Sequence, residues 1–189
     1  MGESKCPGCG LVLPSAGGAS HPYMTASPEC WSAYALLLAA QYANPARMRF
    51  HQLVVDAYAV QHPGAQGPEP DRRAIQSVGI HLMTLCLFLE HSVDPSLGTS
   101  LHKSMAERPV FTYLPAPDHL GFLTHAAVPL DGDPTAARAA VYGWAQSVWD
   151  AWFAHQATVR GWLITSGLLI EHPGGDLVTV QYVPPPSSQ

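Results

Sequence analysis

A close cysteine pair near the start of the chain is the feature of this sequence most typical of metal chemistry. The string Cys-Pro-Gly-Cys-Gly begins at Cys6 and places a second thiol at Cys9. Such a turn lets two thiolates face one point and lets backbone amides approach the sulfurs, as in zinc knuckles. A redox dithiol is instead expected at the start of a helix that follows a strand, and neither element is predicted here. The pair therefore favours a metal, with a redox dithiol and an inert tail as alternatives.

Two further ligands are needed to complete a tetrahedral site. Cys30 is the expected third ligand, because it lies in the first turn of a predicted helix, where the helix dipole favours a thiolate. If this helix and the next pack as an antiparallel hairpin about Pro45, His62 lies within about one turn of Cys30. His21, in a nearby loop, is the alternative fourth ligand. We therefore predict zinc held by Cys6, Cys9, Cys30 and His62.

Ten histidines in 189 residues form a second group of candidate chemical residues. Five of them lie at predicted helix ends or in loops and are expected to be solvated or packed: His91, His102, His119, His125 and His172. Four others lie within helices or at a helix end, on or beside apolar faces, where an unpaired imidazole would be costly: His51, His62, His81 and His155.

If consecutive helices pack as antiparallel hairpins, some of these groups are predicted to meet in the bundle interior. A hairpin about Gly67 places His81 opposite the second helix, within a turn of His51 and Asp56. Converging imidazoles and a carboxylate can hold a catalytic metal with a bound water, or supply a general base. Because Asp56 lies about 140° round the helix from His51, a structural hydrogen-bond network and unrelated roles are the alternatives. The candidate catalytic residues are His51, Asp56, His81 and His155.

Capping and stop signals predict the helices that would position these groups. Ser27 can cap a helix over 28–43, which has Pro28 at its first position and which Asn44-Pro45 ends. A second helix is expected over 46–61, followed by a loop over 64–70. The longest helix, over 71–91, is apolar on nearly all sides and therefore belongs in the middle of a bundle. Within it, Cys86 is expected to be a small buried apolar residue.

The remainder of the chain is predicted to complete one all-α bundle. Prolines interrupt the region 94–131, which has room for one short helix over 96–107 and is otherwise expected to pack as a loop over the bundle. A tryptophan-rich helix should start at Asp133, continue or kink near His155 and reach about Leu169, before a short strand over 177–183 and a tail. We expect about four to five helices with a zinc-knuckle-like N-terminal segment, as one domain over 1–172 followed by a strand and Pro-rich tail over 173–189.

Composition and charge exclude several kinds of partner. The formal net charge is −5 and the nine lysines and arginines form no basic stripe, so nucleic acid is not an expected partner. The longest nearly apolar runs are about ten residues, half of what a bilayer requires. The N-terminus has no apolar stretch for export, so we expect a cytoplasmic protein with no membrane partner.

Several strings occur together in this chain: Cys6-Pro7-Gly8-Cys9-Gly10, Ser27-Pro28-Glu29-Cys30-Trp31, His51 through Val55-Asp56-Ala57-Tyr58 to His62-Pro63-Gly64, Ser77 with His81, and Ser147-Val148-Trp149-Asp150-Ala151-Trp152. Together they resemble an uncharacterised bacterial family known only as a domain of unknown function, over residues 6 to about 165. The chain is more distantly similar to DinB-like metal-binding four-helix bundles, in which three histidines from two helices hold a divalent metal. The typical pair of histidines four apart on the last long helix is absent here, so this likeness is an architectural analogy.

These observations support two functional hypotheses. The first is a metal- or His-dependent enzyme that acts on a small molecule in the bundle interior. The second is a non-catalytic protein-interaction or ligand-binding module whose zinc is purely structural. An enzyme needs a concave pocket that reaches His51 and His81, whereas an interaction module needs an exposed apolar patch. A protein partner or a homo-oligomer is left open by the sequence.

Overall fold

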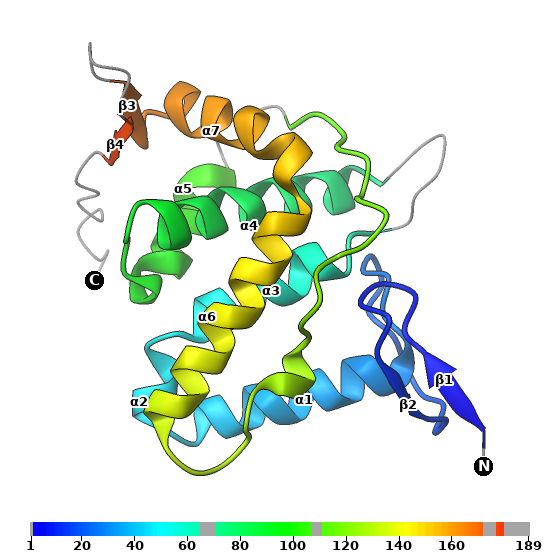
Figure 1. Cartoon of the computed structure of the whole chain (residues 1–189). Helices are drawn as coiled ribbons and strands as arrows, with labels where there is room; N and C mark the ends of the chain where they lie inside the picture. Colours follow the sequence, from blue (N-terminus) through cyan, green and yellow to red (C-terminus); the bar gives the residue numbers. More distant parts are fainter. Residues whose placement is uncertain (1, 65–70, 107–110, 172–176, 180–189) are drawn as a thin grey trace, which may run out of the picture.

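The computed structural model describes residues 2–64, 71–106, 111–171 and 177–179. Within these ranges the chain forms seven α-helices, a few short 3-10 turns and two small antiparallel hairpins (Figure 1). The elements are β1 (Glu3–Lys5), β2 (Val12–Pro14), α1 (Pro28–Tyr42), α2 (Pro45–Met48), α3 (His51–Gln61), α4 (Arg72–Glu90), α5 (Gly98–Ala106), α6 (Pro134–Ala151), α7 (Gln156–Thr165), β3 (Leu169–Glu171) and β4 (Leu177–Thr179). The predicted all-α bundle with a knuckle-like N-terminal segment is confirmed.

The longer helices begin where the sequence signals place them. Ser27 accepts a hydrogen bond from the backbone N–H of Cys30 and caps α1, while Asp71 caps α4. Asp133 caps α6 in the same way and is followed by Pro134 at the first helical position. These caps explain why the predicted starts of the three helices agree closely with the structure.

Three buried tryptophans join α6 to the centre of the molecule, where α3 packs against α4 and α6 (Figure 1). The indole N–H of Trp144 donates to the Gln61 side chain at 2.9 Å, and that of Trp152 donates to the Val60 carbonyl at 3.1 Å. Trp149 donates to Glu90 on α4 at 3.0 Å. Each indole buries a large apolar surface while its N–H keeps a partner, so the cluster specifies how α6 is seated.

Two expected helices are shorter than the hydrophobic pattern indicates. The helix expected over 46–61 is divided into α2 and α3 at Phe50, whose side chain is buried in the core. The tryptophan-rich helix breaks between α6 and α7 near His155, where a kink was one of the two expectations. It ends at Thr165, short of Leu169, because Gly167 (φ 68°) adopts a left-handed conformation. The Gly167 and Leu168 N–H groups then bond back to carbonyls of α7. This C-terminal cap leaves residues 169–171 free to pair with β4.

The segment between α5 and α6 packs over the bundle, as expected for a long apolar loop. Gln61 donates to the carbonyls of Leu120 and Leu123, at 2.8 Å each. Arg47, buried at the other end of the segment, donates to the carbonyls of Pro129 at 2.6 Å and Asp131 at 2.7 Å. Polar side chains of the helices thus satisfy backbone groups of the loop.

Some expectations concern residues outside the described ranges. These are most of the loop over 64–70, the last part of the strand over 177–183 and the C-terminal tail. Among the described residues, no helix combines the length and the apolar character needed to cross a membrane.

Candidate metal centres

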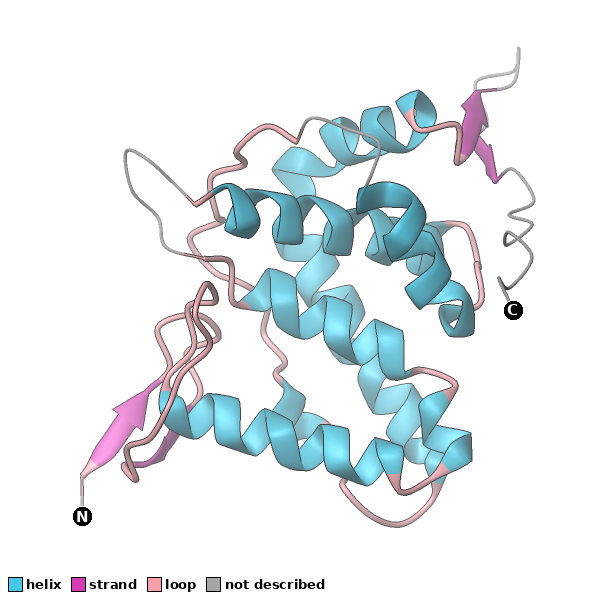
Figure 2. Ribbon diagram, turned by 180° about the vertical axis from the view of Figure 1, so that it is seen from behind, coloured by secondary structure: helices cyan, strands magenta, loops and turns pink. Residues whose placement is uncertain are grey.

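The N-terminal hairpin presents Cys6 and Cys9 on a tight turn between β1 and β2 (Figure 2). The turn is closed by hydrogen bonds from the Cys6 N–H to the Leu11 carbonyl at 2.8 Å and from the Gly10 N–H to the Cys6 carbonyl at 3.0 Å. Gly10 has a φ of 75°, a left-handed conformation that glycine adopts without a steric penalty. The turn thus brings two thiols onto one side of the hairpin.

Gly8 lets this turn lie directly against the end of α3. A Cβ atom at this position would lie 2.5 Å from the Thr25 carbonyl oxygen and 2.6 Å from Cδ2 of the His62 ring. Real Cβ atoms essentially never approach so closely, and the backbone oxygen cannot move away cheaply. The first glycine of the Cys-Pro-Gly-Cys-Gly string therefore permits the contact that brings the cysteine turn to His62.

The four predicted ligands meet at this contact. The Sγ atoms of Cys6, Cys9 and Cys30 and a ring nitrogen of His62 all lie within 4.8 Å of one another, so the group could hold a metal ion. The Cys9 and Cys30 sulfurs are 3.7 Å apart, and the Cys30 sulfur is 3.4 Å from Nε2 of His62. His21, the alternative fourth ligand, instead packs its ring against Tyr23 and Trp31.

Tyr58 orients the ligands from behind. Nδ1 of His62 donates to the Tyr58 carbonyl at 2.8 Å, which leaves the Nε2 lone pair directed at the cysteines. The phenol oxygen of Tyr58 lies 3.7 Å from the Cys30 sulfur, and its ring stacks on Tyr34 of α1 with centroids 3.7 Å apart. Tyr58 therefore joins α1 to α3 at the level of the ligands and selects the imidazole tautomer that a metal requires.

The three thiols also perturb one another electrostatically. Hydrogen bonds from Cys30 and Cys9 lower the pKa of Cys6 far below its usual range. The hydrogen bonds to Cys6 and Cys9, together with burial, raise the pKa of Cys30. Without a metal, the Cys6 thiolate is thus held by hydrogen bonds from the thiols of Cys9 and Cys30. A dication would replace those protons and bind all three sulfurs as thiolates, so metal affinity should fall as the pH falls.

His125 lies buried beside this cluster and takes no part in it. Its ring packs edge-on against Tyr58 and Trp144, and both ring nitrogens are buried without a hydrogen-bond partner among the described residues. Burial lowers the pKa of His125 to about 4. In the folded protein the His125 ring therefore stays neutral at pH values at which it would already be protonated in the unfolded chain.

We expect His125→Phe to reduce the acid sensitivity of the fold. Because the folded pKa is below the unfolded value, the unfolded chain binds the extra proton first, and stability is lost as the pH falls from 6.5 towards 4. At pH 5 the wild-type protein has therefore lost about 2 kcal/mol of its unfolding free energy. His125→Phe should not show this loss, because phenylalanine does not titrate. Urea unfolding of both proteins at pH 7.5 and pH 5 measures the difference. Equal losses in the two proteins would contradict it.

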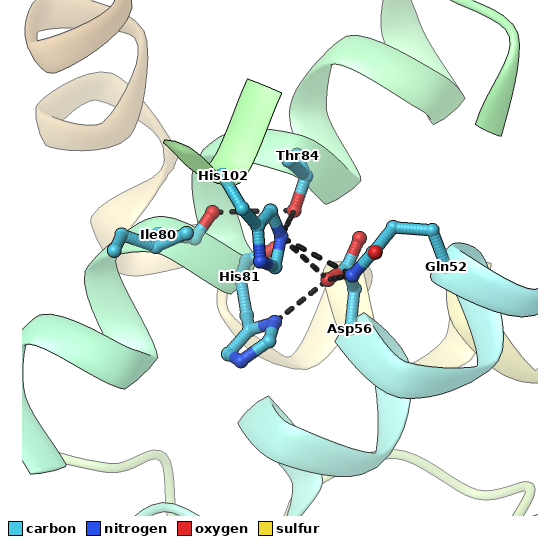
Figure 3. Close-up of polar contacts among 6 residues, drawn as sticks. All are labelled: Gln52, Asp56, Ile80, His81, Thr84 and His102. Carbon is cyan, nitrogen blue, oxygen red and sulfur yellow. Dashed lines mark hydrogen bonds and ion pairs between the residues drawn. The ribbon is translucent and has the colours of Figure 1, made fainter. Parts of the chain in front are cut away.

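A second cluster lies where α3, α4 and α5 meet. Nδ1 of His81 is 2.6 Å from Oδ1 of Asp56, and Nε2 of His102 is 3.1 Å from the same oxygen. Gln52, one turn before Asp56 on α3, donates to that oxygen at 2.8 Å. Figure 3 shows the two imidazoles and the amide converging on one side of the carboxylate. Asp56 is fully buried, whereas both rings keep a partly exposed edge.

The structure brings together two of the four candidate catalytic residues. Asp56 and His81 are in contact, while His51 bonds to Gln41 at 2.9 Å and His155 to the Pro115 carbonyl at 2.8 Å. His102, expected to be solvated or packed, is instead the third member of the cluster. Its approach depends on Gly98, where a Cβ would lie 1.9 Å from Cγ of Gln52. Gly98, at the first position of α5, therefore allows α5 to pack closely against α3.

A third group of potential ligands has a structural explanation. Cys86, Glu90 and His91 lie close enough to hold an ion. The Glu90 carboxylate, however, accepts hydrogen bonds from Arg160 at 2.6 and 2.8 Å and from Trp149 at 3.0 Å. Cys86 is buried, as expected, and contacts the same carboxylate. The negative charge of Glu90 is therefore already paired with Arg160, and this group of residues links α4 to α6 and α7.

Comparison with known proteins gives one result. Neither a search of curated proteins nor a search of solved structures finds a significant match to this chain. A family model does match, and it covers residues 4–153, which include both hairpin cysteines, Cys30, His62 and the Asp56 cluster. On that match, which spans most of the chain, the protein belongs to DUF5946, a family of unknown function.

Proposed function

We propose that the protein binds one zinc ion through Cys6, Cys9, Cys30 and His62. The observation that carries this proposal is the orientation of His62, whose Nδ1 is engaged by the Tyr58 carbonyl while Nε2 faces the Cys30 sulfur. Three thiolates and one imidazole in a compact group form one of the usual structural zinc sets, and soft thiolates disfavour magnesium and calcium.

The role that we propose for this zinc is structural. Four protein ligands complete a tetrahedron and leave no position for a substrate or a reactive water. The ligands also come from three segments, the N-terminal hairpin, the start of α1 and the end of α3, so one ion would join three separate parts of the chain. The energy of metal binding would then contribute directly to the stability of the fold.

Metal analysis tests the proposal. The full-length protein, purified without added metal and dialysed, should retain close to one equivalent of zinc. A thiol-reactive dye should label the cysteines only after a strong chelator is added. Cys86→Ala is the matched control, because it removes a buried cysteine outside the cluster and should keep the zinc. A wild-type protein that contains no zinc and takes up none when it is supplied would refute the assignment.

A metal- or His-dependent reaction on a small molecule is a second candidate function. The observation that favours it is the contact between Asp56 and His81, because a buried carboxylate that orients an imidazole is the usual support for a general base or a metal ligand. We propose no role in this reaction for His51 or His155, which bond elsewhere. A cavity of about 310 Å³ between α2, α6 and the start of the 3-10 turn at Pro95 is lined by Arg49, Asp94, Arg138 and Tyr142, among others. None of the four candidate catalytic residues lines it.

A non-catalytic module with a structural zinc is the alternative, and it too would use the closed thiolate site only for stability. Phe122 and Phe153 are largely exposed, which provides apolar surface for a partner. The two hypotheses differ in what they require of the Asp56 cluster: a reaction needs it to bind a ligand or an ion, whereas a module needs only its hydrogen bonds.

A further inference from the structure

Asp56 uses only one of its two carboxylate oxygens. Oδ1 is contacted by His81, Gln52 and His102 at 2.6, 2.8 and 3.1 Å, whereas Oδ2 is buried and has no partner among the described residues. Three potential donors thus crowd onto one oxygen while its neighbour has none. A buried carboxylate oxygen without a partner is costly, so hydrogen bonds alone leave this cluster poorly satisfied.

Several polar atoms compete for Nε2 of His102. Its Nε2 faces Oδ1 of Asp56 at 3.1 Å, Oγ1 of Thr84 at 3.3 Å and the Gln52 amide at 3.2 Å. Thr84 has a single hydroxyl hydrogen, and carbonyls of its own helix lie within reach of it at 3.1 and 3.2 Å (Figure 3). Once that hydrogen is used there, the hydroxyl presents a lone pair to the ring.

These neighbours compete for one ring nitrogen. A proton on Nε2 can be donated to Asp56 or to Thr84. A bare Nε2 can accept the second amide hydrogen of Gln52, but its lone pair then faces Oδ1 of Asp56 with no hydrogen between them. A cation between these atoms would accept a lone pair from each. Rotation of the Gln52 amide by half a turn would add its oxygen to the same set.

The charge of Asp56 also lacks a permanent counter-ion. Within the described part of the chain, its ion-pair partners are His81 and His102, and no lysine or arginine is paired with it. A neutral imidazole is the form that binds metals, and a dication would compensate the buried carboxylate.

We propose that Asp56, His81 and His102 bind a second divalent transition-metal ion, independently of the thiolate site. Two imidazoles and one carboxylate are typical ligands of zinc or ferrous iron, and three protein ligands leave open positions for water or a substrate. Thr84 and Gln52 flank the ion and orient these ligands. In contrast to the thiolate site, this site is therefore built to expose its metal to a small molecule.

A cobalt(II) titration of the full-length, metal-stripped and reduced protein separates the two sites. Cobalt bound by thiolates gives intense sulfur-to-metal charge-transfer absorption in the near ultraviolet, whereas cobalt bound by nitrogen and oxygen does not. We expect two equivalents to bind, only one of them with that absorption, and native mass spectrometry to show two ions per chain. Because the absorption reports the thiolate site alone, failure of either site can be recognised separately.

Three variants assign the second equivalent. Asp56→Asn and His102→Gln should each bind one cobalt ion, with the charge-transfer absorption unchanged and the second ion bound at least about tenfold more weakly. His51→Gln is the control: it alters a half-buried histidine on the same helix that bonds to Gln41 and lies outside the cluster, and it should bind two.

Saturation of the wild-type protein at one cobalt ion, with the charge-transfer absorption present, would overturn the proposal and leave a hydrogen-bonded network. Full retention of the second ion by His102→Gln would also overturn it. His102 is partly exposed on α5, so this variant is expected to fold even if Asp56→Asn does not.

Discussion

Replacing Cys30 with alanine is expected to release the zinc and to lower the free energy of unfolding by at least about 4 kcal/mol. Structural zinc contributes about 10–16 kcal/mol of apparent binding energy in small zinc domains, and a site that loses one of its thiolates keeps only part of it. Cys30 has no exposed surface, so water cannot replace its sulfur at the ion. For a chain of this size the loss corresponds to a melting temperature lower by about 8–16 °C.

Differential scanning calorimetry of Cys30→Ala beside Cys86→Ala checks this expectation. Both changes remove a fully buried sulfur, but only Cys30 lies in the thiolate cluster. Cys86→Ala should keep the zinc and lose about 1–2 kcal/mol, as a small cavity does. If the two variants melt at similar temperatures, the ion has no structural role.

Arg47→Met is expected to have the next largest effect, with a loss of about 3 kcal/mol of unfolding free energy. The guanidinium is buried and donates to the carbonyls of Pro129, Asp131 and Gly132, which form the turn before α6. Methionine retains much of the apolar stem, so the change isolates these charge-assisted bonds. Urea unfolding monitored by tryptophan fluorescence measures the loss.

The exposed Arg49, two residues further along the chain, provides the control for Arg47. Arg49→Met should change the unfolding free energy by less than about 0.5 kcal/mol. In addition, limited proteolysis of Arg47→Met should cut the segment 129–132 faster than in the wild type. A variant as stable as Arg49→Met, with an unchanged cleavage pattern, would show that the turn does not depend on Arg47.

The thiolate site was predictable because most of its geometry is local. The cysteine turn is encoded by neighbouring residues, and Ser27 and Pro28 place Cys30 in the first turn of α1. His62 required one long-range assumption, that α1 and the following helix return along each other. The stacking of Tyr34 on Tyr58 fulfils that assumption at the level of the ligands.

The Asp56 cluster was only partly predictable because its members depend on how helices rotate and approach. The assumption that two consecutive helices form an antiparallel hairpin predicts which of their residues lie at the same height along the bundle. This is sufficient to pair Asp56 with His81. It does not determine which side of a helix faces inward, and His51 points to Gln41 instead. The helix α5 lies near the start of the region 94–131, which prolines interrupt, and no pattern there indicated which helix α5 would approach, so His102 was not expected in the cluster.

The division of the zinc ligands between a turn and two helices sets an order of events during synthesis. Cys6 and Cys9 leave the ribosome early, but the nascent chain cannot complete the set until residue 62 has emerged and α3 has formed its last turn. Gly8 rests against that same turn, so this contact of the hairpin also forms only then. Binding of a metal at the proposed site would therefore report that the first three helices have been made and have folded against one another.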